Sequence, residues 1–376
     1  MRALVMTAPG GAENSQVREV PVPHPGPGQV AVDVAHAGLN FVDVMTRRGD
    51  AAYAAEWPYR PGKEVSGTVR ELGAGVTGLA VGDRVVAAPV GAGLAEVVVA
   101  EAALTVPLPD GVALREAAAV PLGLATSVLL LTDAGRFTAG DTVLVHSAGG
   151  GIGNAVARLV PLLGGGRLIG TVGRPEKAAA ALASGYDHVF ARGAADGPGA
   201  DGPGADGPGA DGPGADGPGA DGPGADGPGA DGSGSGESGS GGGPAEAIRA
   251  ATGGRGVDLV LDPLGTAALD LDLAVAAPGA RIVLFGNAAG GAVADLPPLG
   301  RLMAGNLTVT GFSHRGLAAT APERLARAVR RVLGLLADGG LVLPVTELPG
   351  LDAVPAAHDA MQEGRATGKY VVRVGG

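Results

Sequence analysis

The stretch that decides the fold of this chain reads Asp141-Thr-Val-Leu-Val-His-Ser-Ala-Gly-Gly-Gly-Ile-Gly153. Val143 to Val145 form an apolar, β-branched-rich run, which predicts a strand buried on both faces. The glycines between residues 149 and 153 allow the backbone to turn sharply and leave no side chain above it. A helix is expected from Asn154 to Leu163 because apolar residues recur there on one face. The sequence therefore predicts a strand, a glycine turn and a helix in succession.

Such a turn suits a pyrophosphate group, because the start of a helix presents unpaired N–H groups and the positive end of its dipole. Ser147 stands where the strict dinucleotide-binding motif has its first glycine, and Gly150, Gly151, Ile152 and Gly153 complete the turn. Glycine-rich turns also occur as plain connections between elements. Whether this turn binds a dinucleotide is therefore judged from the elements that follow it.

Further strands follow the turn, and helical stretches separate most of them. An alternation of this kind specifies a doubly wound parallel sheet, the Rossmann arrangement, in an α/β protein. The predicted strands cover Arg167 to Thr171, Asp187 to Phe190, Val257 to Asp262, Ala280 to Phe285 and Leu307 to Gly311. His146, at the end of the first strand, is expected to be a packed structural residue.

The segment that would contact the adenosine ribose predicts NADPH as the cofactor rather than NADH. About 20 residues past the glycines, NAD-binding folds place an acidic residue that holds the ribose 2′-hydroxyl. Here Gly173 and Arg174 occupy that region, and Lys177 follows. Both cations suit a 2′-phosphate through charge-assisted hydrogen bonds. The alternative is that both are solvated residues at a helix start.

Composition sets the limits of the chemistry. The chain has 376 residues, enough for two domains, and no cysteine, which excludes disulfides, thiolate-bound zinc and a cysteine nucleophile. The N-terminus lacks the features of a signal peptide, and the longest apolar stretch, Ala117 to Leu131, is too short to span a bilayer. A cytoplasmic protein without a membrane segment is expected. Nucleic acid is not an expected partner because no basic stripe is present.

A low-complexity insert runs from Ala195 to Gly243. The unit Ala-Asp-Gly-Pro-Gly repeats seven times without error, and a Ser/Gly-rich tail follows. No residue in the insert can build a core, so we expect it to be disordered. Its aspartates and Glu237 supply most of the formal net charge of −11. The insert is either a tolerated surface expansion or an acidic tether for a partner.

Several motifs in the right order over nearly all of the remaining chain resemble the medium-chain dehydrogenase/reductase superfamily, and within it the zinc-free quinone oxidoreductase (zeta-crystallin-like) branch. These motifs are Ala37-Gly-Leu-Asn-Phe-Val-Asp43, Arg48-Gly49, Pro61-Gly-Lys-Glu-Val-Ser-Gly67, Gly82-Asp-Arg-Val85, Val145-His-Ser-Ala-Gly-Gly-Gly-Ile-Gly153, Gly253-Gly-Arg-Gly-Val-Asp258, Ala357-His358 and Arg365-Ala-Thr-Gly-Lys369.

The resemblance implies a GroES-like β-barrel catalytic domain formed by residues 1–122 and 314–376, with a Rossmann NADP-binding domain of residues 123–313 inserted between the two segments. The short strands, such as Val30 to Val34 and Val97 to Val99, with frequent glycine and proline before residue 110, agree with that arrangement. The two domains are expected to meet in a cleft that shields the nicotinamide from water.

Departures from the zinc-dependent relatives argue against a metal. Those relatives place a cysteine where Asn40 stands and a histidine where Lys63 stands, and their structural zinc needs four cysteines. We therefore expect no metal ligands and no Lewis-acid alcohol dehydrogenase mechanism.

The resemblance also assigns site residues. Asn40, Asp43, Tyr53 and Lys63 are the catalytic candidates: Asn40 to donate to a substrate carbonyl, Asp43 to position a ribose hydroxyl or a water, and Tyr53 and Lys63 to face the cleft. Each has a bland alternative, either capping of nearby backbone or a solvated surface position. The expected cofactor contacts are Phe41, Val42, Thr126, Ser147, Gly150, Gly151, Ile152, Gly153, Arg174, Lys177, Arg192, Phe285, Gly286, Asn287, Gly311, Phe312, Ser313 and Arg365.

These features together predict an NADPH-dependent quinone oxidoreductase that transfers hydride to a quinone or a conjugated carbonyl. Two alternatives stay open: an enoyl reductase acting on enones or enoyl thioesters, which needs a proton donor such as Tyr53 or Lys63, and a non-catalytic NADPH-binding protein of crystallin-like or redox-sensing type. The resemblance also implies a homodimer joined through an outer strand, for which Leu307 to Gly311 is the candidate.

Overall fold

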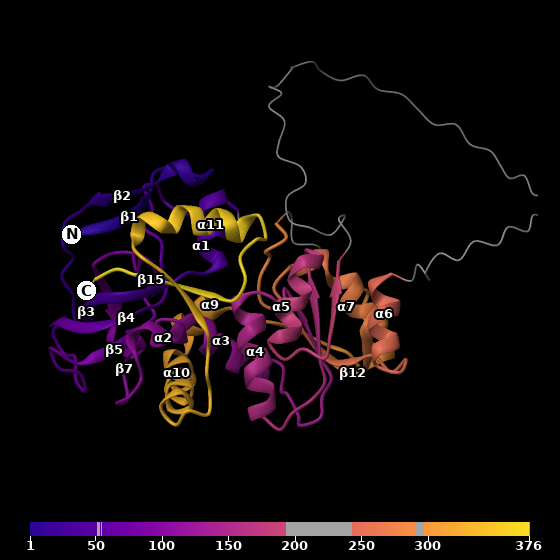
Figure 1. Ribbon diagram of the computed structural model, residues 1–376. Helices are drawn as coiled ribbons and strands as arrows, with labels where there is room; N and C mark the ends of the chain where they lie inside the picture. The colour runs from indigo at the N-terminus through magenta and orange to yellow at the C-terminus, as the bar shows by residue number, and fades with distance from the viewer. Residues whose placement is uncertain (51–52, 54, 193–242, 291–296, 376) are drawn as a thin grey trace, which may run out of the picture.

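The computed structural model describes residues 1–50, 53, 55–192, 243–290 and 297–375. Two large sheets lie side by side (Figure 1). The insert predicted between residues 195 and 243 lies, except for Gly243, outside the described residues. The expected α/β fold, with a GroES-like part and a Rossmann part, is confirmed.

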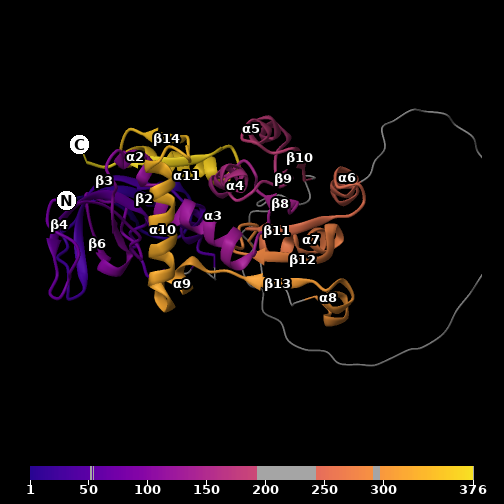
Figure 2. The same ribbon diagram turned by 90° about the horizontal axis from the view of Figure 1, so that it is seen from below.

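The six-stranded sheet is parallel throughout and has the strand order β10-β9-β8-β11-β12-β13 (Figure 2). In chain order this is 3-2-1-4-5-6, the doubly wound order whose switch point lies between the first and fourth strands. The strands are β8 (Val143–His146), β9 (Leu168–Val172), β10 (His188–Ala191), β11 (Val257–Asp262), β12 (Ala276–Leu284) and β13 (Thr308–Gly311).

Alternate side chains of these strands enter two separate cores, which explains their nearly continuous apolar sequence. On β8, Val143 and Val145 join one core, whereas Leu144 joins the other. Helix α4 (Gly151–Leu162) packs in the first core, and α6 (Pro244–Ala251) and α7 (Leu269–Val275) pack in the second. The remaining helices of this half are α5 (Ala178–Ala183) and α8 (Leu299–Gly305).

The seven-stranded sheet is mostly antiparallel and has the order β14-β15-β3-β4-β5-β7, with β6 also paired to β3. Its strands come from both ends of the chain: β3 (Gln29–Gly38), β4 (Val65–Leu72), β5 (Arg84–Ala87), β6 (Val97–Glu101) and β7 (Thr105–Pro107), then β14 (Val345–Leu348) and β15 (Lys369–Arg373). A separate hairpin pairs β1 (Arg2–Met6) with β2 (Ser15–Glu19). The exact domain boundaries stay a prediction.

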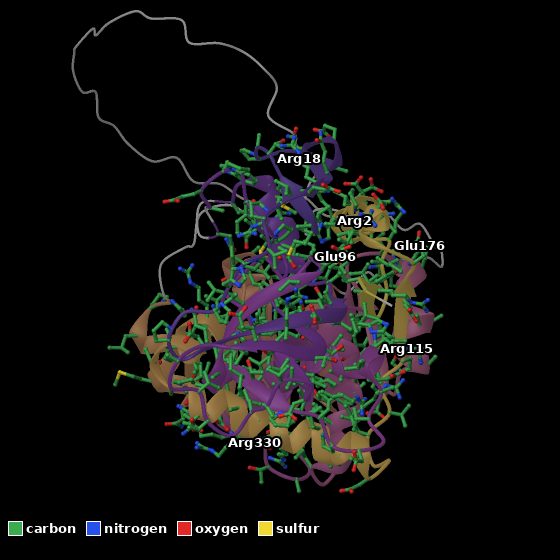
Figure 3. All side chains as sticks on the ribbon, turned by 90° about the vertical axis from the view of Figure 1, so that its left-hand side faces the viewer. Arg2, Arg18, Glu96, Arg115, Glu176 and Arg330 are labelled. Atoms are coloured by element: carbon green, nitrogen blue, oxygen red, sulfur yellow. The ribbon has the colours of Figure 1, made fainter. Side chains whose placement is uncertain are left out.

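The helices of this half are α1 (Phe41–Arg48), α2 (Leu114–Ala117), α3 (Ala125–Leu129), α9 (His314–Thr320), α10 (Pro322–Ala337) and α11 (Val354–Gln362). Strongly charged side chains such as Arg18, Arg115 and Arg330 lie on the surface (Figure 3). Several charged side chains are buried instead, among them Glu64 and Lys369, which pair with each other.

Candidate active site

The glycine turn after β8 has the geometry of an anion-binding helix start. Ser147 adopts a left-handed conformation with φ of 58°, which a glycine adopts with less strain. Helix α4 begins at Gly151, and no side chain of the described residues caps Gly150. The first-turn N–H groups of Gly151, Ile152 and Gly153 therefore have no intrahelical acceptor and point out of the helix end. The predicted helix began at Asn154, three residues late.

Gly153 is required for packing rather than for its backbone angles. A Cβ at this position would lie 2.3 Å from the carbonyl oxygen of Ala148. Any residue other than glycine would therefore clash with the backbone of Ala148. The close approach keeps the start of α4 against the end of β8, so the free N–H groups are held at one place.

The residues at this turn fit a pyridine dinucleotide. The bare turn offers backbone donors to a diphosphate. Thr126, on α3, is only 6% exposed, and its hydroxyl oxygen has no hydrogen-bond partner among the described residues. A buried hydroxyl without a partner costs free energy, and an incoming amide or ribose group would satisfy it.

Three cations follow β9 and β10, where we predicted the 2′-phosphate. Arg174 is exposed. Lys177 donates from Nζ to the carbonyl oxygen of Ala366 at 2.6 Å, and burial, followed by the nearby Arg174, lowers its pKa. Arg192 is 6% exposed, and its Nη1 lies 3.3 Å from the hydroxyl of Thr171. Arg174 is thus the cation of the three that is most open to a ligand.

The loop between α11 and β15 crosses the glycine turn. Gly368 donates its backbone N–H to the carbonyl oxygen of Gly149 at 2.9 Å. Arg365, which we expected near the cofactor, forms a salt bridge with Glu363 at 2.5 Å and is 55% exposed. In the described residues Arg365 therefore makes a surface salt bridge, and its contact with the cofactor stays a prediction.

A buried ion pair follows that loop directly. Lys369 pairs with Glu64, and its Nζ also lies 2.8 Å from Oδ1 of Asn40 and from the carbonyl oxygen of Leu39. Glu64 in turn accepts the backbone N–H groups of Leu122 at 2.8 Å and of its neighbour at residue 123. The pair thus ties β15, β4 and the segment before α3 together.

This pair also engages the amide of Asn40. Nδ2 donates to Glu64 at 2.9 Å and approaches the carbonyl oxygen of Gly38 at 3.3 Å. Oδ1 accepts from Lys369 at 2.8 Å. Because both ends of the amide are engaged, donation to a substrate carbonyl would require one of these bonds to be exchanged. The arrangement supports a positioning role for Asn40.

Asp43 lies on the first turn of α1 with Phe41 and Val42. Its carboxylate is fully buried and accepts the backbone N–H of Gly62 at 3.0 Å. Burial raises the pKa of Asp43, and the nearby Lys63 opposes the shift. Asp43 therefore anchors the loop before β4 to α1, which was its alternative interpretation.

Tyr53 contacts the other half of the molecule, whereas Lys63 contacts the loops of its own half. Burial raises the pKa of Tyr53, while a hydrogen bond to its phenol from the backbone of Asn287 opposes the shift. Asn287 follows β12, so this contact joins the two halves. Lys63 lies 2.9 Å from the carbonyl oxygen of Val90 and 3.3 Å from the hydroxyl of Tyr59. Burial lowers the pKa of Lys63, and Asp43 opposes that shift.

The segments that follow β12 (residues 285–287) and β13 (residues 312–313) lie at the same edge of the parallel sheet as the glycine turn. Phe285 donates its N–H to Asp262, and Phe312 donates to Leu284, each at 2.9 Å. Gly286 has no room for a Cβ, which would lie 2.7 Å from the carbonyl oxygen of Pro263. Ser313, after Gly311 and Phe312, accepts the N–H of Gly316 at 3.0 Å and caps α9.

His146 belongs to a buried polar cluster below this edge. Its Nδ1 lies 2.7 Å from Thr171 Oγ1, and its Nε2 lies 2.6 Å from Asp272 Oδ1. Burial lowers the pKa of His146 to about 4 and raises that of Asp272 to about 8. Asp262 lies close enough for its pKa to rise to about 7 through burial and the charge of Asp272. His146 is packed, as its alternation on β8 suggests.

Sequence reasoning did not single out four residues at this site: Tyr59, Glu64, Lys369 and Arg315, the last of which interacts electrostatically with Tyr59 and Lys63. Glu64 and Lys369 are charged residues beside apolar strands, a pattern that signals a buried pair without naming the partners. Tyr59 and Arg315 carry no such signal.

In the described part of the chain, no group of three histidine or acidic side chains is arranged to hold a metal ion, and no helix is long and apolar enough to cross a membrane.

The fold and the site define a class of protein: a chain with a GroES-like sheet and a Rossmann sheet, whose glycine turn fits a pyridine dinucleotide. Comparisons with known proteins agree. Residues 26–110 match the alcohol dehydrogenase GroES-like domain, and residues 243–372 match the family model described as a zinc-binding dehydrogenase. Quinone oxidoreductase of Pseudomonas aeruginosa is 30% identical over 99% of each chain. This chain therefore belongs to the quinone oxidoreductase branch of the medium-chain dehydrogenase/reductase superfamily.

Two further similarities extend this result. The human synaptic vesicle membrane protein VAT-1 homolog-like is 36% identical over 52% of this chain, and that alignment spans 46% of the human protein. The crystal structure of Escherichia coli quinone oxidoreductase complexed with NADPH has a TM-score of 0.77 and 25% identity, and it covers 99% of this chain and all of that chain.

Proposed function

We propose that this protein is an NADPH-dependent oxidoreductase that reduces a quinone or another conjugated carbonyl. The observation that carries the proposal is the uncapped start of α4, held against β8 by Gly153 and facing the space between the two halves. The family and the NADPH complex of the Escherichia coli relative support it. The expected cytoplasmic location stays a prediction.

In this proposal the first-turn N–H groups of α4 bind the diphosphate, and Arg174 and Arg192 bind the 2′-phosphate by charge-assisted hydrogen bonds. Thr126 and the backbone after β12 and β13 position the nicotinamide end. NADPH supplies hydride when bound. Tyr53, in contact with Asn287, closes one side of the cleft, which excludes water and strengthens the electrostatic interactions inside.

The cofactor assignment is tested by titrating the full-length protein with NADPH and NADH and recording nucleotide fluorescence. We expect the wild type to bind NADPH more tightly. Arg174→Ala should weaken NADPH binding by roughly tenfold, the equivalent of about 1.4 kcal/mol, and leave NADH binding unchanged. The control is Arg330→Ala on α10, which should change neither. Equal affinity of the wild type for the two nucleotides would contradict the assignment.

We further propose that two copies of the chain pair through β13. This strand lies at one end of the six-stranded order and therefore has a free edge within the described sheet. Helix α8 lies beside it (Figure 2) and exposes two large apolar side chains, Leu299 at 70% and Met303 at 69%. An unpaired edge beside an apolar surface favours strand addition from a second copy.

A further inference from the structure

Tyr59 and Lys63 form a fixed phenol–ammonium pair on the loop before β4. The backbone of Tyr59 is held by two hydrogen bonds to Met6, each 2.8 Å long, and its ring packs edge-to-face on Trp57 with the centroids 6.3 Å apart. Lys63 Nζ lies 3.3 Å from the phenolic oxygen and 2.9 Å from the carbonyl oxygen of Val90. The ammonium therefore has a defined position beside the hydroxyl.

The pair faces charged groups from two other elements. Asp43 on α1 and Arg315 on α9 lie close enough to influence both Tyr59 and Lys63 electrostatically. His314, also on α9, lies close enough to Lys63 for the two to interact electrostatically, and its Nε2 donates to the carbonyl oxygen of Pro121 at 3.1 Å. The pair therefore lies close to both α1 and α9, and α9 begins directly after the segment that follows β13. Tyr59 is only partly buried, so the residue is not sealed off from solvent.

We propose that Tyr59 donates the proton that completes the reduction of a conjugated carbonyl, and that Lys63 positions it and stabilises the phenolate. The proposal rests on the proposed function, because the hydride must come from NADPH. Hydride adds to the β-carbon, and the electrons of the double bond move to the carbonyl oxygen. The Tyr59 O–H bond then breaks as the α-carbon gains the proton. Water returns a proton to the tyrosinate.

The surroundings of the pair suit this role. Burial, followed by the charge of Asp43, raises the pKa of Tyr59, so the phenol keeps its proton at neutral pH. Donation produces an anion 3.3 Å from an ammonium group and near Arg315, where the charge is stabilised at the moment it forms. Tyr53 is the rival donor, but its hydroxyl contacts the backbone of Asn287, and no lysine contact to it is present among the described residues.

The test compares NADPH oxidation with trans-2-hexenal and with 1,4-benzoquinone as probes. Tyr59→Phe should lower kcat for the enal by about a hundredfold, within the range of general acid catalysis. The quinone rate should fall by less than about threefold, because water readily protonates a hydroquinone oxygen. Tyr370→Phe on β15 is the matched control and should change neither rate. NADPH affinity should stay unchanged in both variants.

A second comparison tests the positioning role of Lys63. Lys63→Met removes the ammonium beside the phenol and should lower kcat for the enal, while NADPH affinity and the quinone rate stay nearly unchanged. Lys63→Arg keeps a cation beside the phenol and should restore part of the enal rate. Replacing a lysine that only holds the loop in place would lower both rates together.

The outcomes separate the proposal from the function on which it rests. The donor role is overturned if Tyr59→Phe reduces the enal as fast as the wild type, if Tyr53→Phe alone causes the loss, or if the wild type reduces benzoquinone and not the enal. It is also overturned if Lys63→Met reduces the enal as fast as the wild type. Failure of the wild type to oxidise NADPH with either probe would reject the proposed function itself and the donor role with it.

Discussion

Gly153 shows how one missing side chain sets the geometry of the site. Replacing it with alanine would force a Cβ to within 2.3 Å of the Ala148 carbonyl oxygen. We expect Gly153→Ala to cost about 1–3 kcal/mol of stability, as for other overpacked positions, and to weaken NADPH binding because α4 has to move away. Urea denaturation and nucleotide titration measure the two effects.

The control for this variant is Gly334→Ala on α10, where the added Cβ would meet no described atom within 4 Å apart from its own chain neighbours and helix backbone. A glycine in a helix interior is less favourable than alanine by about 0.5–1 kcal/mol, so this variant should be as stable as the wild type or more so. If both variants bind NADPH equally well, the close contact at Gly153 does not hold the anion site in place.

The cluster of His146, Asp262 and Asp272 makes stability depend on pH. Burial raises the pKa of Asp272 from 3.8 to about 8, so its contribution to stability is complete below about pH 4 and is lost as the pH rises towards 8. Asp262, with a pKa of about 7, acts in the same direction. His146 acts oppositely, but its contribution is lost only as the pH falls from 6.5 through about 4.

We therefore expect the free energy of unfolding to fall between pH 6.5 and pH 8. Asp272→Asn keeps the shape of the side chain and removes its titration, so the decline should become shallower. Urea unfolding at several pH values measures this, with the exposed Asp338→Asn as control. An identical pH dependence in wild type and Asp272→Asn would contradict the assignment.

Individual contacts were the least predictable level. Asn40 was expected at the active site from its motif, yet its amide is fixed by Glu64 and by Lys369, which is 329 residues away in the chain. Local sequence carries no signal for a pairing over such a separation. The turn at Ser147, by contrast, was expected from the glycine motif, and its positive φ is a conformation that a glycine adopts readily.

At the level of elements, the order of strands and helices was predictable and their ends were not. All six strands of the parallel sheet are present, and β11 has the predicted bounds. The strand β12 was expected from residue 280 and begins at Ala276, because the chain leaves α7 directly in an extended conformation. Helix α1 was not predicted, because it is only eight residues long. So short a helix shows no clear helical periodicity of apolar residues in the sequence.

The free edge of β13 gives a prediction at this scale. Leu299→Glu combined with Met303→Glu places two charges on the exposed face of α8 and should convert a dimer to a monomer in light-scattering measurements. The control Val342→Glu changes a side chain that is 67% exposed and lies away from β13, and it should not alter the mass. A wild-type monomer, or a double variant that stays dimeric, would reject pairing through this edge.

For the whole molecule, the expectation is that residues 195–243 are dispensable for activity. Lengthening a closed loop from about 10 to about 50 residues costs only about 1.4 kcal/mol, because the entropy depends on the logarithm of its length. Replacing the repeat with a short Gly/Ser linker should leave NADPH oxidation nearly unchanged and the melting temperature equal or slightly higher. A large loss of either would favour the acidic tether.

The crossing of the glycine turn by residues 364–369 has a consequence for biosynthesis. A ribosome makes the chain from its amino end, so the whole parallel sheet can emerge before the segment that supplies Lys369 and the Gly368 contact. Until Lys369 has been synthesised, Glu64 lacks the ammonium group with which it pairs. A nascent or truncated polypeptide would therefore bind coenzyme poorly, and only a chain translated past residue 369 could gain the protection from proteolysis that a bound nucleotide gives.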